Sequence, residues 1–143
     1  MRHAYRSFAL LVVLVVVATT LPAGAEHTVY YRYVVLGFVK DARGQPTAER
    51  PVDVIRQKTG LSYPTTTDEQ GFFVVVVRLG DEGAGETLTL RVGQAATTIT
   101  TRFDPANHSD DRGTRVDLEG TTFVERTAAF RTTLTGYLGG GTH

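Results

Sequence analysis

The segment of residues 71–79 constrains the fold more than any other part of the sequence. It contains Phe72 and Phe73, followed by four consecutive valines at positions 74–77. Aromatic and β-branched side chains favour extended backbone. A short unbroken apolar run of this kind predicts a strand buried on both faces, either at the centre of a sheet or beneath another element.

Six further segments have β character and are separated by glycine, proline or aspartate turn signals. None of them carries an apolar stripe with helical spacing, which excludes a fold of alternating strands and helices. Strands at intervals of about 8–12 residues are typical of a β-sandwich. We therefore predict an all-β, seven-stranded antiparallel sandwich. The six segments are residues 30–39, 51–56, 61–66, 87–92, 95–103 and 114–118.

Residues 1–25 have the pattern of a helical secretory signal peptide. Arg2 and Arg6 give a positive start, an uncharged apolar run covers residues 8–18, and Ala-Gly-Ala precedes Glu26, which predicts cleavage there. The alternative is a retained anchor, but 11 firmly apolar residues fall short of the about 20 that span a bilayer. We expect a periplasmic or secreted protein with no stable membrane span after cleavage.

Cleavage would change the charge balance of the chain. Arg2 and Arg6 leave with the signal, so the 15 lysine and arginine residues fall to 13, against 15 aspartate and glutamate residues. A slightly acidic chain argues against a nucleic-acid partner, which usually needs a basic surface. The absence of cysteine excludes a disulfide scaffold, thiolate metal sites, cysteine nucleophiles and lipid attachment through an N-terminal cysteine.

Two similar turn motifs lie about 30 residues apart. The first is GFVKDARGQP at residues 37–46, followed by Val-Asp-Val at 52–54, and the second is TDEQGFF at residues 67–73. An aspartate can bond to the nearby backbone, and the glycine three residues later can adopt the left-handed conformation of such a turn. The motif residues are Gly37, Asp41, Gly44, Pro46, Thr67, Asp68, Gly71 and Phe73.

Together these motifs resemble the carboxypeptidase regulatory-like domain, a small transthyretin-like β-sandwich, over about residues 33–119. The resemblance implies an immunoglobulin-like or transthyretin-like sandwich at residues 26–120, followed by a tail at 121–143. It also implies an exported accessory, binding or structural module of the cell envelope. A transthyretin-like hydrolase is a second alternative, although residues 137–143 lack the Tyr-Arg-Gly-Ser-like ending of that family.

Candidate chemistry is sparse in this chain. No G-x-S-x-G elbow surrounds Ser62 or Ser109, and we expect a non-enzymatic protein without a cofactor. The polar loop of residues 104–113 concentrates oxygen ligands that suit Ca²⁺, although a solvated turn explains the same composition. A carrier of a small ligand or metal ion is therefore the first alternative. Its candidate ligands are Asp104, Asn107, Asp110, Asp111 and His27.

The tail of residues 121–143 allows more than one structure. Its apolar residues fall roughly on one helical face, whereas its threonines lower helix propensity, and residues 130–138 also alternate like a strand. The tail could add an edge strand, pack back on the sandwich, or dock on a partner. We expect the partner to be an envelope protein, with candidate contacts at Phe123, Phe130, Leu134 and Tyr137.

Overall fold

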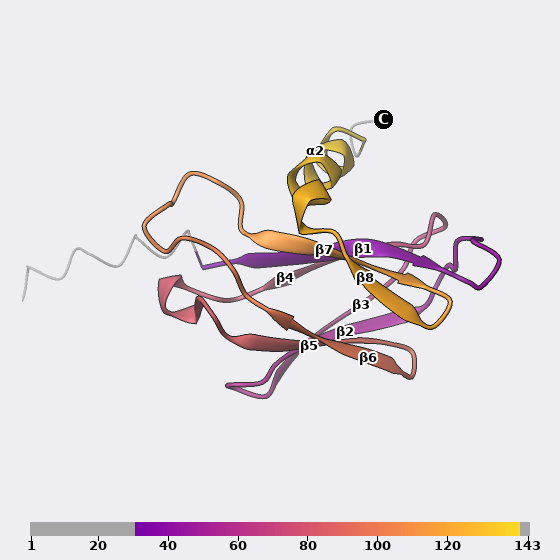
Figure 1. Cartoon of the computed structure of the whole chain (residues 1–143), viewed down its shortest axis with the longest axis horizontal. Helices are drawn as coiled ribbons and strands as arrows, with labels where there is room; N and C mark the ends of the chain where they lie inside the picture. The colour runs from indigo at the N-terminus through magenta and orange to yellow at the C-terminus, as the bar shows by residue number, and fades with distance from the viewer. Residues whose placement is uncertain (1–30, 141–143) are drawn as a thin grey trace, which may run out of the picture.

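The computed structural model describes residues 31–140, which form two β-sheets packed face to face with a helix outside one of them (Figure 1). One sheet has the strand order β4-β1-β7-β8 and the other β3-β2-β5-β6. The prediction of an all-β fold is confirmed. The strands are β1 (Tyr33–Lys40), β2 (Pro51–Arg56), β3 (Leu61–Thr66), β4 (Phe72–Val77), β5 (Thr87–Val92), β6 (Ala95–Thr100), β7 (Gly113–Glu119) and β8 (Thr122–Glu125).

Three short helices complete the described part of the chain: the 3₁₀ helices η2 (Asp81–Gly83) and η3 (Thr127–Ala129), and the α-helix α2 (Phe130–Gly140). Among the helices within residues 31–140, none is both long and apolar enough to cross a membrane. The expected signal peptide of residues 1–25 lies outside the described residues.

The prediction of seven antiparallel strands is wrong in two respects. An eighth strand, β8, forms a hairpin with β7, in which Leu118 lies opposite Phe123. In addition, β1 and β7 pair in parallel, with Val34 opposite Gly113. The apolar pattern of a strand is the same for both directions of pairing, so it could not reveal this pair. The domain boundary expected at residue 120 falls inside the β7–β8 hairpin.

Alternating side chains of the two sheets meet in one core. Along β5, Leu88, Leu90 and Val92 point inward and are buried, as a period of two requires. The valine-rich strand β4 lies at the edge of its sheet rather than at its centre. Its outer-face residue Val76 is accordingly 52% exposed, whereas Phe72 on the same face is buried.

The tail both extends a sheet and packs back on it. β8 is an edge strand of the β4-β1-β7-β8 sheet, and α2 lies over the outer face of that sheet (Figure 1). Phe130 and Leu134, one helical turn apart, are 3% and 8% exposed and form a second apolar cluster with Leu36 and Phe72. Tertiary burial of this stripe outweighs the low helix propensity of the threonines.

The two aspartate turns have the same local structure. The carboxylates of Asp41 and Asp68 each accept the backbone N–H of the residue four positions later, at 3.0 Å. Gly44 and Gly71 have φ values of +81° and +75°, in the region that glycine enters without steric cost. After the first turn, Pro46 forms an isolated bridge to the end of β1. The turns therefore fix where β1 ends and β4 begins.

The other motif residues position the strands. A Cβ on Gly37 would lie 1.8 Å from the carbonyl oxygen of Val116, so only glycine permits the close approach of β1 and β7. Thr67 is buried, and its hydroxyl donates to the carbonyl of Thr47 at 2.6 Å. Phe73 lies in the main core.

Candidate binding groove

An open groove of about 710 Å³ lies between α2 and the outer face of its sheet. Phe38 of β1 and Phe72 of β4 contribute adjacent rings, with centroids 5.0 Å apart. The ring of Tyr137 on α2 lies 5.1 Å from that of Phe72. Tyr137 is 44% exposed, so the groove offers an aromatic surface that the described chain does not fill.

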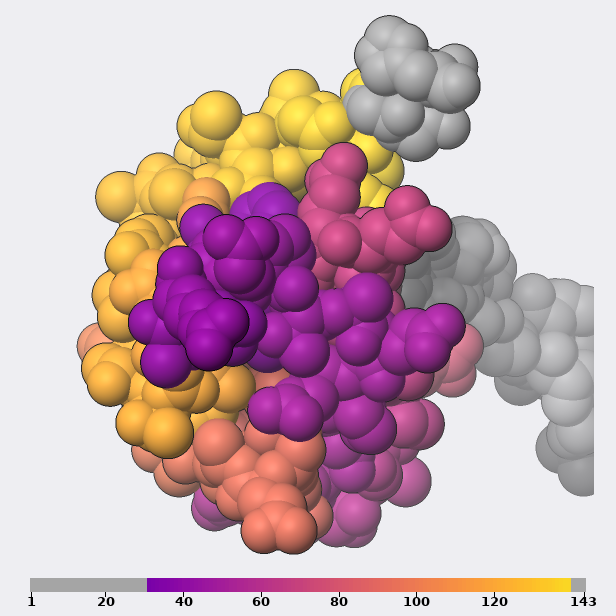
Figure 2. All heavy atoms as spheres, turned by 90° about the vertical axis from the view of Figure 1, so that its right-hand side faces the viewer, coloured from indigo at the N-terminus to yellow at the C-terminus, as the bar shows by residue number. Residues whose placement is uncertain are grey.

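The turn between β3 and β4 supplies negative charge to the groove, which residues 68–70 line. Figure 2 shows this turn and α2 at the same end of the molecule. The carboxylate of Asp68 is engaged by backbone N–H groups of its own turn. Glu69 is exposed, and its side chain makes no hydrogen bond or ion pair with any residue in 31–140. Glu69 is therefore the carboxylate that can meet a basic group of a ligand.

Arg115 of β7 is fixed at the groove by Asp117. Its Nε and Nη2 atoms lie 3.1 and 2.9 Å from the two carboxylate oxygens of Asp117, which is 3% exposed. Nη1 donates to the hydroxyl of Thr133 on α2 at 3.1 Å, and the guanidinium carbon lies 5.0 Å from the ring centre of Phe38. Arg115 thus joins α2 to the sheet and lines the groove with a fixed, aromatic-stacked cation.

Sequence reasoning did not identify Arg115 and Asp117 as site residues. Their alternation with Val116 and Leu118 indicates a strand with one apolar face, and charged residues on the other face usually contact water. α2 covers that face only in the tertiary structure, and the sequence of β7 contains no local pattern that predicts this.

The four predicted partner contacts have different environments. Phe130 and Leu134 are buried between α2 and the sheet, and Phe123 of β8 is partly buried against the main core. Burial against the chain's own sheet removes the first two from any partner surface. Tyr137 is the member of the set that lines the groove.

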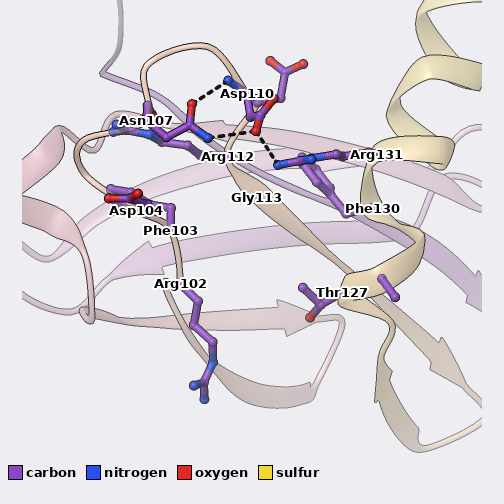
Figure 3. A pocket seen from close by; sticks show the side chains of 12 residues that line it. Arg102, Phe103, Asp104, Asn107, Asp110, Arg112, Gly113, Thr127, Phe130 and Arg131 are labelled. Atoms are coloured by element: carbon purple, nitrogen blue, oxygen red, sulfur yellow. Dashed lines mark hydrogen bonds and ion pairs between the residues drawn. The ribbon is translucent and has the colours of Figure 1, made fainter.

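Four of the five predicted metal ligands lie in the loop between β6 and β7, beside a second cavity of about 420 Å³. Asp110 accepts from the side-chain amide of Asn107 at 2.8 Å and pairs with Arg131 of α2 at 3.0 Å (Figure 3). Asp111 pairs with Arg32 at 2.9 Å. These contacts brace the loop against the sheet and helix.

The same carboxylates do not converge on a common point. Asp104 accepts the backbone N–H of Ala106 at 2.9 Å, as in an ordinary Asx turn. Within residues 31–140, no group of three or more histidine, aspartate and glutamate residues is arranged to hold a metal ion. His27, the fifth predicted ligand, lies outside the described residues.

The loop is also anchored on η2 by Asp81, which lies 2.8 Å from Arg112 and 2.9 Å from His108. Hydrogen bonds from Arg112 and then from His108 hold the pKa of Asp81 below its usual value. The guanidinium of Arg112 is buried over the ring of Phe103, 4.3 Å from its centre. The contacts of Arg112 and His108 with Asp81, and of Arg112 with Phe103, therefore hold the β6–β7 loop against η2.

No family model and no curated protein matches the chain. Among solved structures, catechol 1,2-dioxygenase from Acinetobacter sp. ADP1 is similar over 63% of this chain, with 14% identity and a TM-score of 0.42. This chain spans 45% of that protein. The dioxygenase domain of a dioxygenase carbohydrate-binding protein fusion from Streptomyces sp. SirexAA-E is similar over 69% of this chain and 78% of its own length, with 16% identity and a TM-score of 0.38.

These neighbours correct one expectation. Both are dioxygenases, so the expectation of a non-enzymatic protein is withdrawn. TM-scores below 0.5 assign neither a reaction nor a catalytic residue to this chain. The resemblance to the carboxypeptidase regulatory-like domain stays a prediction.

Proposed function

We propose that this chain is an exported binding module whose groove between α2 and the sheet holds a short segment of another envelope protein. The observation that carries the proposal is Tyr137, which stands 44% exposed beside Phe72 in an open groove of about 710 Å³. Aromatic residues in a concave site commonly act as binding anchors. The signal-peptide pattern of residues 1–25 and the transthyretin-like resemblance support the envelope location and the accessory role.

The groove chemistry defines the segment that would fit. An aromatic or branched apolar side chain would pack between Phe72 and Tyr137, where offset or tilted aromatic contacts are favourable. A basic residue of the segment would pair with Glu69, whose carboxylate has no partner within residues 31–140. The charge of Arg115 is already paired with Asp117, and one of its N–H groups bonds to Thr133, so Arg115 shapes the groove and is not needed as a partner for an acidic residue.

Replacing Tyr137 with serine tests this proposal against a matched control. Leu61 of β3 is a large apolar residue on the other sheet and is 55% exposed, so Leu61→Ser removes exposed apolar surface elsewhere. Affinity capture from native envelopes should recover the same partner with the wild-type chain and Leu61→Ser, but not with Tyr137→Ser. Equal recovery with both variants would contradict the proposal. Deleting residues 121–143 is a poor test because it also removes β8.

A small apolar ligand is the alternative occupant of the same groove. The volume of about 710 Å³ lies within the roughly 300–1,000 Å³ that is usual for small-molecule sites. Native mass spectrometry of the purified chain separates the two occupants. A bound mass of small-molecule size that Tyr137→Ser loses would favour the carrier function over the protein partner.

A further inference from the structure

The four edge strands of the sandwich differ in how well they are protected against pairing with another chain. β3 contains Pro64, which cannot donate a ladder hydrogen bond, and β8 has only four residues. β6 has neither a charge nor a proline, but its threonine and alanine residues make it less apolar than β4. β4 consists of six consecutive apolar residues without a charge or a proline. Edge strands without such protection are ready templates for pairing with a further strand.

The hydrogen bonds of β4 show which backbone groups are free. The N–H of Val39 donates to the carbonyl of Gly71 at 2.8 Å. In this antiparallel register, the backbone N–H and carbonyl groups of the odd-numbered residues of β4 therefore point toward β1. The backbone N–H and carbonyl groups of the even-numbered residues point away from β1, toward the open edge of the sheet. Phe72 is occupied, because its N–H and carbonyl both bond to Asp68.

Two residues remain at the open edge, Val74 and Val76. Within residues 31–140 their N–H and carbonyl groups have no hydrogen-bond partner. Their side chains point to the outer face of the sheet, where Val76 is 52% exposed. The open edge thus combines four unpaired backbone groups with exposed apolar surface.

We propose that a second copy of this chain pairs with β4 in an antiparallel arrangement. With Val74 of each copy opposite Val76 of the other, the free groups of both edges are used in four hydrogen bonds. The two-fold axis then passes between the two copies of Val75. This is an isologous interface, in which the same patch serves both subunits.

Charge complementarity supports a second copy as the occupant. In this register Arg78, which follows β4, lies opposite Phe72 of the other copy and beside the acidic turn that contains Asp68 and Glu69. The side chains of Arg78 and Glu69 are both exposed and unpaired within residues 31–140. The two-fold symmetry brings opposite charges together twice, once at each end of the paired strands.

The paired strands would join the two β4-β1-β7-β8 sheets into one sheet of eight strands. Val74 and Val76 of both copies would then form a shared apolar patch on the outer face, next to both α2 helices. Cross-strand contacts between β-branched side chains are favourable. The hydrogen bonds between the paired strands do not depend on what occupies the groove. Glu69 lines both sites, so a basic group bound in the groove would compete with Arg78 of the second copy.

Sedimentation of the full chain over about a hundredfold range of concentration tests the proposal. We expect a monomer–dimer equilibrium, with the dimer weakened at least about tenfold by Val76→Lys because a charge on the edge opposes pairing. Thr98→Lys places the same charge on the exposed edge strand β6 and should leave the equilibrium unchanged. A monomer at every concentration, or a dimer that Val76→Lys does not weaken, would overturn the proposal.

Cysteine pairing tests the register independently, because the chain has no native cysteine. Facing residues of a hydrogen-bonded antiparallel pair have Cα atoms about 5.5 Å apart, within the range for a disulfide. Under mild oxidation, an equal mixture of Val74→Cys and Val76→Cys chains should give the mixed disulfide dimer well above the roughly one half of all dimers that random pairing gives, because only Val74 and Val76 of different copies face each other. Only random proportions of the three dimers, or no crosslink, would overturn this register.

Discussion

Asp117 of β7 accepts the backbone N–H of Phe38 of β1 at 2.9 Å, so a buried carboxylate supplies an acceptor within the parallel β1–β7 pairing. The same carboxylate binds Arg115 at 2.9 Å and Arg126 at 2.6 Å. The residue that completes the pairing of two central strands therefore also fixes the cation beside the groove.

Asp117→Ala should lower the free energy of unfolding by about 3 kcal/mol, because it leaves the Phe38 N–H and two arginines without their shared acceptor. Glu119→Gln is the matched control. Glu119 is exposed and pairs with Arg126 at 3.2 Å, a surface contact worth at most about 1 kcal/mol. Chemical denaturation of both variants measures the difference, and equal losses would show that Asp117 is not the centre of this network.

Gly37→Ala should destabilise the fold by about 3 kcal/mol or more, because the new methyl group would overlap the carbonyl oxygen of Val116. The same substitution at Gly136 of α2 meets no atom within 4 Å. It should instead stabilise the chain by about 0.5–1 kcal/mol through helix propensity. Thermal unfolding should therefore shift in opposite directions, and a harmless Gly37→Ala would refute the close approach of β1 and β7.

Glu86→Gln should cost about 1–2 kcal/mol near neutral pH, because Glu86 forms two hydrogen bonds with Arg56, at 2.8 and 2.6 Å. These bonds hold the pKa of Glu86 below its usual 4.5. A lowered folded-state pKa gives stability above the unfolded-state pKa that is lost as the pH falls. The difference between wild type and variant should shrink below about pH 4.5. The neighbouring exposed Glu82→Gln serves as control and should show little loss at either pH.

Tyr33→Phe should remove a component of alkaline unfolding. Burial raises the pKa of Tyr33 to about 12 from 10.0, although a backbone hydrogen bond from Arg102 opposes the rise. A raised folded-state pKa gives stability that is complete below the unfolded-state value and is lost as the pH rises through the folded-state value. The wild type should therefore lose more stability than Tyr33→Phe between pH 10 and pH 12, and parallel curves would refute a buried phenol.

Each of the seven strand segments predicted from the sequence overlaps a strand of the structure. Their positions were predictable because turn signals and β-branched runs are local features. The sequence missed β8 and left α2 undecided, since the threonines of residues 121–135 lower helix propensity, whereas the apolar residues of the tail fall roughly on one helical face. It left open whether the valine run lies at the centre of a sheet or beneath another element, because an apolar run cannot show whether a sheet or a helix covers its outer face. The strand lies at a sheet edge, and α2 packs on Phe72 and Val74 of its outer face.

The candidate groove was less predictable than the fold. Tyr137 was expected to contact a partner, and Asp68 to form a turn, but nothing in the sequence places these two residues at one site. That proximity depends on how α2 crosses the sheet, which is fixed by the burial of Phe130 and Leu134. The proximity of Arg115 and Asp117 to the groove has the same origin.

The most direct test of the groove is site-specific photocrosslinking in intact cells. A photoreactive phenylalanine analogue at position 137 replaces an exposed ring without adding charge, and the same analogue at position 61 reports on the opposite sheet. We predict a crosslink to one envelope protein from position 137 and none from position 61. No protein crosslink from position 137, or the same product from both positions, would contradict the groove as the partner-binding site.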